Sequence, residues 1–197
     1  LKRYNKKNAI VITDVGIVKA GLVEKVTDVL ERENIQFTVF SGVKAEPDAS
    51  GIVQAVELVK KESCDVVVSV GGGSAMDTAK GVAVMTVNPG HIRDYAGLNL
   101  IKNQGMMHIA IPTTSGTGSE ATIWAVISEK DKGIKYGVGS DFMVPTISLC
   151  DPTMTLTLPP KLTALSGIDA LSHALESFIN KATQPVSEAL SDGALRL

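Results

Sequence analysis

The sequence predicts an α/β fold in which a parallel β-sheet is followed by the start of an all-helical region. Short runs rich in Val and Ile alternate with stretches of helical periodicity, as in βαβ units. Only 4% of the residues are aromatic, so the core consists mainly of Val, Ile, Leu and Ala, which suits buried parallel strands. After Lys161 no further strand pattern occurs.

The first half of the chain contains three predicted strands, each followed by a helix. Apolar runs bounded by turn residues indicate the strands, and apolar residues three and four positions apart indicate the helices. We expect strands at 9–13, 37–40 and 65–70, and helices at 18–33, around 52–59 and at 74–85. Glu46-Pro47-Asp48 forms a turn before the second helix.

The second half begins with further strands and then becomes helical. We expect strands at 108–112 and 147–149, and between them a hairpin of strands 124–128 and 135–138. From Lys161 onward the apolar residues follow helical spacing, so we place a boundary near Pro159. The chain is therefore divided into an α/β domain, residues 1–158, and the first helices of a second domain, residues 159–197.

The composition argues against several classes of partner. The formal net charge is −2 and the basic residues are spread along the chain, so no nucleic-acid partner is expected. No apolar run approaches the ~18 residues of a membrane span, and the first residues lack the apolar core of a signal peptide. Cys64 and Cys150 lie far apart in apolar surroundings, which favours buried free thiols. We expect a cytoplasmic protein without a membrane partner.

The strongest local signal is a glycine-rich turn between a strand and a helix. Gly71-Gly72-Gly73 follows the strand, and Ser74 begins the helix. Glycine lets a phosphate approach the main chain, and the helix N-terminus adds N–H donors and partial positive charge. The common dinucleotide fingerprint would need glycine in place of Met76, and Lys80 lies too far into the helix for a Walker motif. The alternative is that the glycines only permit a tight turn against the sheet.

A second polar loop, Thr113 to Ser119, follows the strand at 108–112. The carboxyl ends of parallel strands share one edge of a sheet, where ligands bind in open α/β folds. Asp14 ends the first strand at the same edge, where a carboxylate could bind ribose hydroxyls and repel a 2′-phosphate. An ordinary capped loop and an exposed turn aspartate are the alternatives. Together the two loops predict a Rossmann-like nucleotide-binding domain.

Asp169 and His173 are four residues apart in the helical region, so they share one face of a helix. A carboxylate oxygen and an imidazole nitrogen suit a divalent metal such as Fe²⁺ or Zn²⁺. An ordinary hydrogen bond within the helix is the alternative. Neither His91 nor His108 is placed to join the pair, so we expect the remaining ligands beyond Leu197. The chain is expected to be truncated at both ends.

Three motifs resemble those of the iron-containing (group III) alcohol dehydrogenases, which include lactaldehyde reductase, 1,3-propanediol dehydrogenase and butanol dehydrogenases. The motifs are Gly71–Lys80 (GGGSAMDTAK), Pro112–Glu120 (PTTSGTGSE) and Gly167–Glu176 (GIDALSHALE). Their order and spacing match the family, and the resemblance covers essentially the whole chain. It corresponds to about the first half of such an enzyme.

The resemblance implies an NAD-linked oxidoreductase that reversibly oxidises a primary alcohol or diol to the aldehyde, with Fe²⁺ as the Lewis acid. Zn²⁺ is a possible replacement, no protein general base is evident, and a homo-oligomer is expected. The residues that the resemblance assigns to NAD are Asp14, Gly72, Gly73, Ser74, Asp77, Thr113, Thr114, Thr117 and Lys135. The residues that it assigns to the metal are Asp169 and His173.

Each of these residues has an implied role. The resemblance places Gly72, Gly73 and Ser74 at the pyrophosphate, and the three threonines on the adenine and ribose side. It gives Asp14 the selection of NAD over NADP. Asp77 would lie near a phosphate or the nicotinamide ribose, and Lys135 would contact the cofactor from the hairpin.

One residue departs from the family pattern, and two other functions stay open. Glu46 stands where some members have an asparagine that approaches the cofactor, and its negative charge could weaken dinucleotide binding. The first rival function is a catalytically incomplete NAD-binding module, because this chain supplies only two metal ligands. The second is a zinc-dependent enzyme resembling glycerol dehydrogenase or dehydroquinate synthase. The sequence does not name the alcohol.

Overall fold

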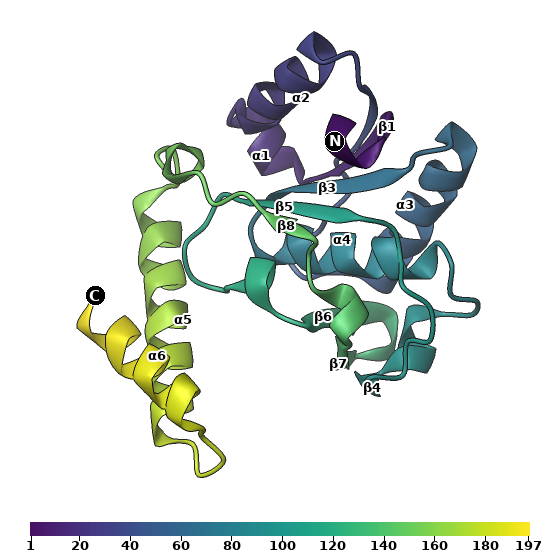
Figure 1. Cartoon of the computed structure of the whole chain (residues 1–197). Helices are drawn as coiled ribbons and strands as arrows, with labels where there is room; N and C mark the ends of the chain where they lie inside the picture. Colours follow the sequence, from purple (N-terminus) through teal and green to yellow (C-terminus); the bar gives the residue numbers. More distant parts are fainter.

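The computed structural model describes all 197 residues, and its centre is a five-stranded parallel sheet (Figure 1). The strand order is β2-β1-β3-β5-β8, so the chain proceeds from β1 to one edge and then to the other. The strands are β1 (Asn8–Ile12), β2 (Gln36–Phe40), β3 (Val66–Gly71), β5 (His108–Pro112) and β8 (Ile147–Ser148). The predicted α/β fold with a Rossmann-like parallel sheet is confirmed.

Helices cover the two faces of the sheet. One face carries α1 (Val15–Lys19) and α2 (Leu22–Arg32), and the other carries α3 (Ala49–Glu62) and α4 (Gly73–Met85) (Figure 1). Successive residues of a strand point to opposite faces, so β1 contributes to two cores. Ala9 and Val11 pack on the α2 side, and Ile10 and Ile12 pack on the side of α3 and α4.

The single helix predicted at 18–33 is wrong, because the structure has two helices there. The short helix α1 ends at Lys19, and α2 begins at Leu22. Gly21 between them has φ +70°, a left-handed conformation that glycine adopts without steric cost and that interrupts a helix. The apolar periodicity of α2 continues backwards across this break, which is why the sequence pattern concealed it.

A second, three-stranded sheet packs against α4. It contains β4 (Gly97–Leu98), β6 (Trp124–Glu129) and β7 (Ile134–Gly139), in the order β4-β7-β6. The predicted hairpin is confirmed, since β6 and β7 pair antiparallel. A short 3-10 helix, Lys2–Tyr4, precedes β1. Further 3-10 helices connect the elements at Ile92–Tyr95, Ser119–Ala121, Lys130–Lys132, Asp141–Met143 and Pro152–Met154.

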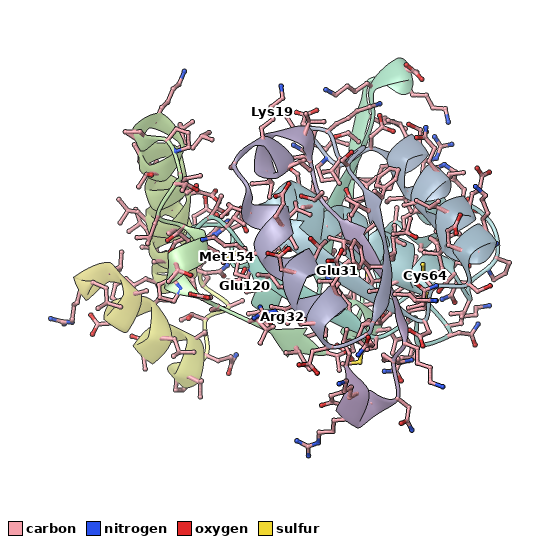
Figure 2. The ribbon with its side chains drawn as sticks, turned by 90° about the horizontal axis from the view of Figure 1, so that it is seen from above. Lys19, Glu31, Arg32, Cys64, Glu120 and Met154 are labelled. Carbon is pink, nitrogen blue, oxygen red and sulfur yellow. The ribbon has the colours of Figure 1, made fainter.

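The last two helices stand apart from the sheets. They are α5 (Pro160–Ile179) and α6 (Pro185–Arg196), and both figures show the pair beside the α/β part (Figures 1 and 2). The prediction of helices without further strands after Lys161 is confirmed. Large apolar side chains of this pair are exposed, namely Leu162, Leu165, Ile168, Leu171, Leu175, Phe178, Ile179, Val186 and Leu190. No helix of the structure is both long and apolar enough to cross a membrane.

The two cysteines differ in their surroundings. Both thiols are free, as expected, and Cys64 is buried. Cys150 is exposed, so the expectation of a buried thiol is wrong for this residue. It lies two residues after the short edge strand β8, in a segment where residues 149–153 are all exposed.

Asp48 begins helix α3 and connects the turn before it to the helix. Its carboxylate accepts hydrogen bonds from the Ser50 N–H and the Lys44 ammonium, each at 2.7 Å. Burial alone would raise the pKa of Asp48, but these two partners outweigh it and lower the pKa from 3.8 to about 2.

We expect Asp48→Ala to lower the free energy of unfolding by about 1 kcal/mol at neutral pH, because α3 loses its N-cap. The folded-state pKa lies below the unfolded value of 3.8, so this contribution is complete above that pH and is lost as the pH falls towards 2. Urea unfolding of both proteins at neutral and at acidic pH measures the difference. Asp28→Ala, on the exposed side of α2, is the control, and a difference that persists at low pH would contradict the assignment.

Candidate active site

The glycine turn connects β3 to α4 and presents bare main chain. The helix α4 begins at Gly73, with Gly72 as its N-cap and no side-chain cap. The N–H groups of Gly73 and Ser74 have no acceptor within the chain. Such groups at a helix start carry partial positive charge and bind anions. Ser74 does not cap the helix, because its hydroxyl donates to the Ala45 carbonyl at 2.6 Å.

The threonine loop that follows β5 packs directly on this turn. Gly71 of β3 pairs in register with Pro112 of β5, so the two loops leave the sheet at the same edge, as predicted. A Cβ at Gly72 would lie 3.2 Å from Thr114, and one at Gly73 would lie 2.8 Å from Thr117. A side chain at Gly73 would therefore force the Thr117 side chain to shift, and one at Gly72 would be in tight contact with Thr114. The same packing keeps side chains away from the N–H groups of the helix start.

A cleft of about 620 Å³ opens at this edge of the sheet, a volume typical of small-molecule sites. Seven of the nine residues that the sequence assigned to a dinucleotide line it, namely Asp14, Gly72, Gly73, Ser74, Thr113, Thr114 and Thr117. Leu162 and Ser166 of α5 also line the cleft. The Gly116 main chain touches that of Ser166, so a Cβ at Gly116 has no room.

Two threonine hydroxyls of the cleft lack partners. The Oγ1 atoms of Thr113 and Thr114 are buried and make no hydrogen bond. Buried polar atoms in proteins are nearly always paired, and an orphan therefore calls for a specific explanation. A ligand with hydroxyl or phosphate oxygens would satisfy both, because a threonine hydroxyl donates as well as accepts.

Asp14 lies in the cleft as the N-cap of α1. Its Oδ1 accepts hydrogen bonds from the N–H groups of Gly16, at 2.7 Å, and Ile17, at 3.1 Å. The carboxylate is thereby held in one orientation, and Oδ2 has no partner within the chain. A fixed carboxylate with one free oxygen is suited to accept hydrogen bonds from hydroxyl groups of a ligand.

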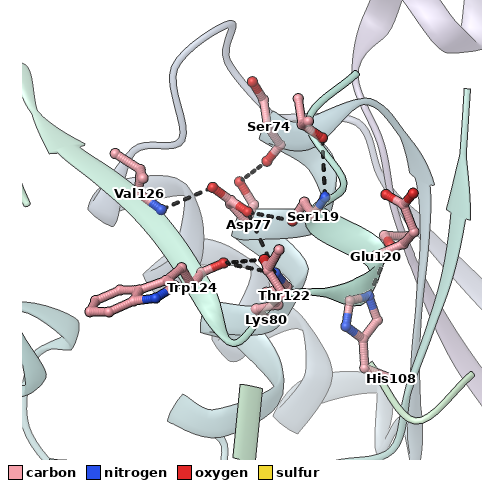
Figure 3. A network of polar contacts seen from close by, with 12 residues as sticks. Ser74, Asp77, Lys80, His108, Ser119, Glu120, Thr122, Trp124 and Val126 are labelled. Carbon is pink, nitrogen blue, oxygen red and sulfur yellow. Dashed lines mark hydrogen bonds and ion pairs between the residues drawn. The ribbon is translucent and has the colours of Figure 1, made fainter. Parts of the chain in front are cut away.

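Asp77 and Lys135 lie outside the cleft lining. Both oxygens of Asp77 are used within the chain, one accepting from the Ser119 hydroxyl at 2.7 Å and the other from the Val126 N–H at 2.9 Å (Figure 3). Burial raises the pKa of Asp77, against these two hydrogen bonds and the charge of Lys80. Lys135 is exposed on β7, opposite Ser128 of β6.

Glu46 also points away from the cleft. Its carboxylate lies 3.8 Å from the Lys130 ammonium, and it is not part of the cleft lining. The residues that precede Glu46 line the cleft instead, namely Val43, Lys44 and Ala45. The negative charge that departs from the family pattern is thus directed at the hairpin.

The Asp169–His173 pair lies on the exposed surface of α5. The Asp169 Oδ1 and His173 Nε2 atoms are 3.9 Å apart, and the side chains are 44% and 57% exposed. The two atoms are close enough together to contact one divalent ion, so the pair fits as two ligands of a metal site. No group of three or more His, Cys, Asp and Glu side chains in the structure could hold a metal.

Sequence reasoning missed a polar network behind the cleft. Lys80 is fully buried and donates to the Thr122 hydroxyl and the Trp124 carbonyl (Figure 3). His108 is buried as well, with Nε2 2.8 Å from the Ser69 hydroxyl, and burial lowers its pKa to about 3. The available signal was the spacing of Asp77 and Lys80, which places both on one side of α4.

The fold and the cleft define a Rossmann-like α/β protein with a cleft at the carboxyl edge of its parallel sheet. The family model "Iron-containing alcohol dehydrogenase" matches residues 1–152. The chain belongs to this family, as its three motifs indicated.

The relatives show how much of such a protein the chain represents. It is 41% identical to alcohol dehydrogenase 4 of Schizosaccharomyces pombe, over 100% of this chain and 47% of that protein. The solved 1,3-propanediol oxidoreductase has a TM-score of 0.93 at 33% identity, over 96% of this chain and 50% of the other. The solved sulfoacetaldehyde reductase of Bifidobacterium kashiwanohense, in complex with NAD⁺, has a TM-score of 0.91 at 33% identity, over 99% of this chain and 52% of the other. The chain spans about half the length of the curated relatives it matches.

We expect Gly73→Ala to lower the free energy of unfolding by roughly 1–2 kcal/mol, since overpacking against Thr117 outweighs the gain in helix propensity. Gly73→Ala with Thr117→Ser should recover most of the loss, because the shortened residue lacks the Cγ2 atom that lies 2.8 Å away. Gly193→Ala is the control in α6, where a Cβ meets nothing within 4 Å. Equal denaturation curves for Gly73→Ala and the unmodified protein would show that the loop does not rest on the turn.

Proposed function

We propose that the protein containing this chain binds NAD in the cleft and reversibly oxidises a primary alcohol or diol to the aldehyde. One observation carries the proposal: unpaired N–H groups of Gly73 and Ser74 share the cleft with the unpaired hydroxyls of Thr113 and Thr114. These donors and the positive end of α4 suit a diphosphate and ribose. Membership of the family supports the reaction class.

The proposed dinucleotide runs along the edge of the sheet. Its diphosphate lies at Gly72, Gly73 and Ser74, where no Cβ comes between an anion and the N–H groups of the two glycines. Its adenosine ribose lies at Asp14, whose free Oδ2 accepts from the ribose hydroxyls. The loop from Thr113 to Thr117 provides the adjoining wall.

The selection of NAD over NADP is proposed to rest on the charge of Asp14. A 2′-phosphate at this ribose would place negative charge against the carboxylate, whose orientation the N–H groups of Gly16 and Ile17 fix. Lys44 also lines the cleft, but its ammonium is paired with Asp48 at 2.7 Å. Charge complementarity at the ribose therefore favours two free hydroxyls.

Asp169 and His173 are proposed to supply two ligands of a divalent iron, with zinc as the alternative metal. The helix α5 leads from the cleft wall at Leu162 and Ser166 to this pair, and His173 lies about two turns beyond Ser166. A bound iron would supply Lewis-acid activation of an alcohol, and bound NAD would accept the hydride. The chain's own residues orient the cofactor and close one side of the cleft.

A second candidate function is a dinucleotide-binding module without catalysis. It is favoured by the exposed pairing of Asp169 with His173 on α5, which is also an ordinary contact between side chains four residues apart on a helix. The two candidates differ in turnover, because both bind NAD but only the enzyme oxidises an alcohol.

We expect Asp14→Asn to shift the cofactor preference of the whole protein towards NADP. Asparagine is as good an N-cap as aspartate, so α1 is preserved while the charge is removed. The ratio of the NADPH to the NADH dissociation constant, from fluorescence titration, should fall by roughly tenfold. Asp14→Ala is the matched variant that removes cap and charge together. An unchanged ratio in both variants would show that Asp14 does not face the ribose.

We expect His173→Ala to abolish iron binding and turnover while NADH binding persists. The whole protein is loaded anaerobically with Fe²⁺, its metal content is measured, and NADH formation is followed with ethanol or propanediol. Loss of one ligand should lower activity by more than about 100-fold. Iron bound equally by His173→Ala and the unmodified protein would exclude this site. NADH binding without iron or turnover in the unmodified protein would support the module instead.

A further inference from the structure

The cleft at the edge of the sheet is lined by only two charged side chains, those of Asp14 and Lys44. The other lining residues are apolar, are glycines or carry hydroxyl groups. One carboxylate and one ammonium therefore decide which charge a ligand meets in the cleft. A cation beside the ribose can accommodate the 2′-phosphate of NADP, so the position of the Lys44 ammonium bears on the choice of cofactor.

The main chain around Lys44 lies between Asp14 and the start of α4. On one side, Gly42 forms an isolated β-bridge with Asp14. On the other side, the Ala45 carbonyl accepts a hydrogen bond from the Ser74 hydroxyl at 2.6 Å. The side chain of Lys44 therefore leaves the backbone between the positions proposed for the ribose and the diphosphate.

The ammonium of Lys44 is held by Asp48 at 2.7 Å. This hydrogen bond and the charge of Asp48 raise the pKa of Lys44. The other carboxylate oxygen of Asp48 accepts from the Ser50 N–H, also at 2.7 Å, as the N-cap of α3. The Asp48 side chain is 13% exposed and that of Lys44 is 54% exposed. The carboxylate is therefore the anchored partner, and it decides where the ammonium lies.

Neither the helix cap nor stability explains why the residue at position 48 is charged. Asparagine and serine cap a helix about as well as aspartate does. Ion pairs with an exposed partner usually contribute little to stability. What a carboxylate adds at position 48 is a charged partner that keeps the Lys44 ammonium away from the phosphates of a ligand.

We propose that Asp48 is a positioning residue that favours NAD over NADP. Asp14 repels a 2′-phosphate, and Asp48 withholds the one cation of the cleft that could compensate for this repulsion. Asp48 does not line the cleft, so it acts through Lys44 and not by contact with the ribose. The inference rests on the proposed binding of NAD in this cleft, with its adenosine ribose at Asp14.

The experiment is a double-mutant cycle in the whole protein with Asp48→Asn and Lys44→Met. Asparagine keeps the N-cap of α3 and removes the charge, and methionine removes the ammonium from an unbranched side chain. The readouts are the NADPH and NADH dissociation constants by fluorescence at low ionic strength, and the melting temperature. Asp131→Asn is the control, because this exposed carboxylate of the hairpin acts on Lys44 only through its charge.

We expect Asp48→Asn to lower the NADPH dissociation constant by roughly fivefold, the effect of one exposed charge pair, because the freed ammonium can approach the 2′-phosphate. The NADH dissociation constant should change by less than about twofold. In the Lys44→Met background, Asp48→Asn should give no gain for NADPH, and Asp131→Asn should leave the ratio of the two constants unchanged. The gain should shrink at high ionic strength, because exposed charges are screened. The same gain should appear in the Asp14→Asn background, where tighter NADPH binding is easier to measure.

A gain for NADPH that persists in the Asp48→Asn, Lys44→Met double variant would overturn the inference, because it would come from the loss of negative charge alone. Unchanged NADPH affinity in Asp48→Asn, or equal gains for both cofactors, would overturn it as well. If Asp48→Asn does not fold, Asp48→Ser decides, since serine also caps a helix. Absence of NADH binding by the unmodified protein is a different result, because it refutes the proposed function itself.

Discussion

The close approach of two loops at the carboxyl edge of the sheet is the constraint on which the rest of the site depends. Because Gly71 and Pro112 are paired in register, the glycine turn and the threonine loop leave the sheet side by side. A Cβ at Gly73 would lie 2.8 Å from the Thr117 side chain, so the two loops disfavour a side chain at this position. The steric requirement that removes side chains from the turn also leaves the first N–H groups of α4 accessible. One packing contact therefore shapes the wall and the floor of the cleft.

The segment that follows the threonine loop is held on α4 by polar contacts, although most of the core is apolar. Apolar packing tolerates small displacements, whereas the hydrogen bonds from Lys80 to Thr122 and Trp124 have fixed directions. The nearby His108 stays neutral, because burial lowers its pKa to about 3, and so adds no second positive charge beside Lys80. Lys80 is thus the buried basic residue of the interior, and both of its hydrogen bonds go to the segment that follows the threonine loop.

Much of the fold could be predicted from the sequence, because strand and helix periodicities are local. The break at Gly21 was missed because the apolar spacing of α2 continues across it. The residues of the cleft were found through motifs at strand ends, whereas Lys80 was noted only as too distant for a phosphate-binding lysine. Its contacts cross 42 and 44 positions of sequence, and no local pattern reports such partners. Several expectations stay predictions. They are the cofactor roles of Asp77 and Lys135, the two metal ligands, the domain boundary, the cytoplasmic location and the homo-oligomer.

Some contacts of the α/β part join residues that are far apart in the sequence, and this has a kinetic consequence. Asp77 and Val126 lie 49 residues apart, and β5 pairs with β8 only after the whole hairpin has been made. Contacts of this kind require large loops to close before any stabilising energy is gained, which slows folding. During synthesis the β1–β3 half of the sheet can assemble while the threonine loop is still inside the ribosome. The edge where the glycine turn meets the threonine loop is therefore expected to be among the last parts of the α/β domain to form.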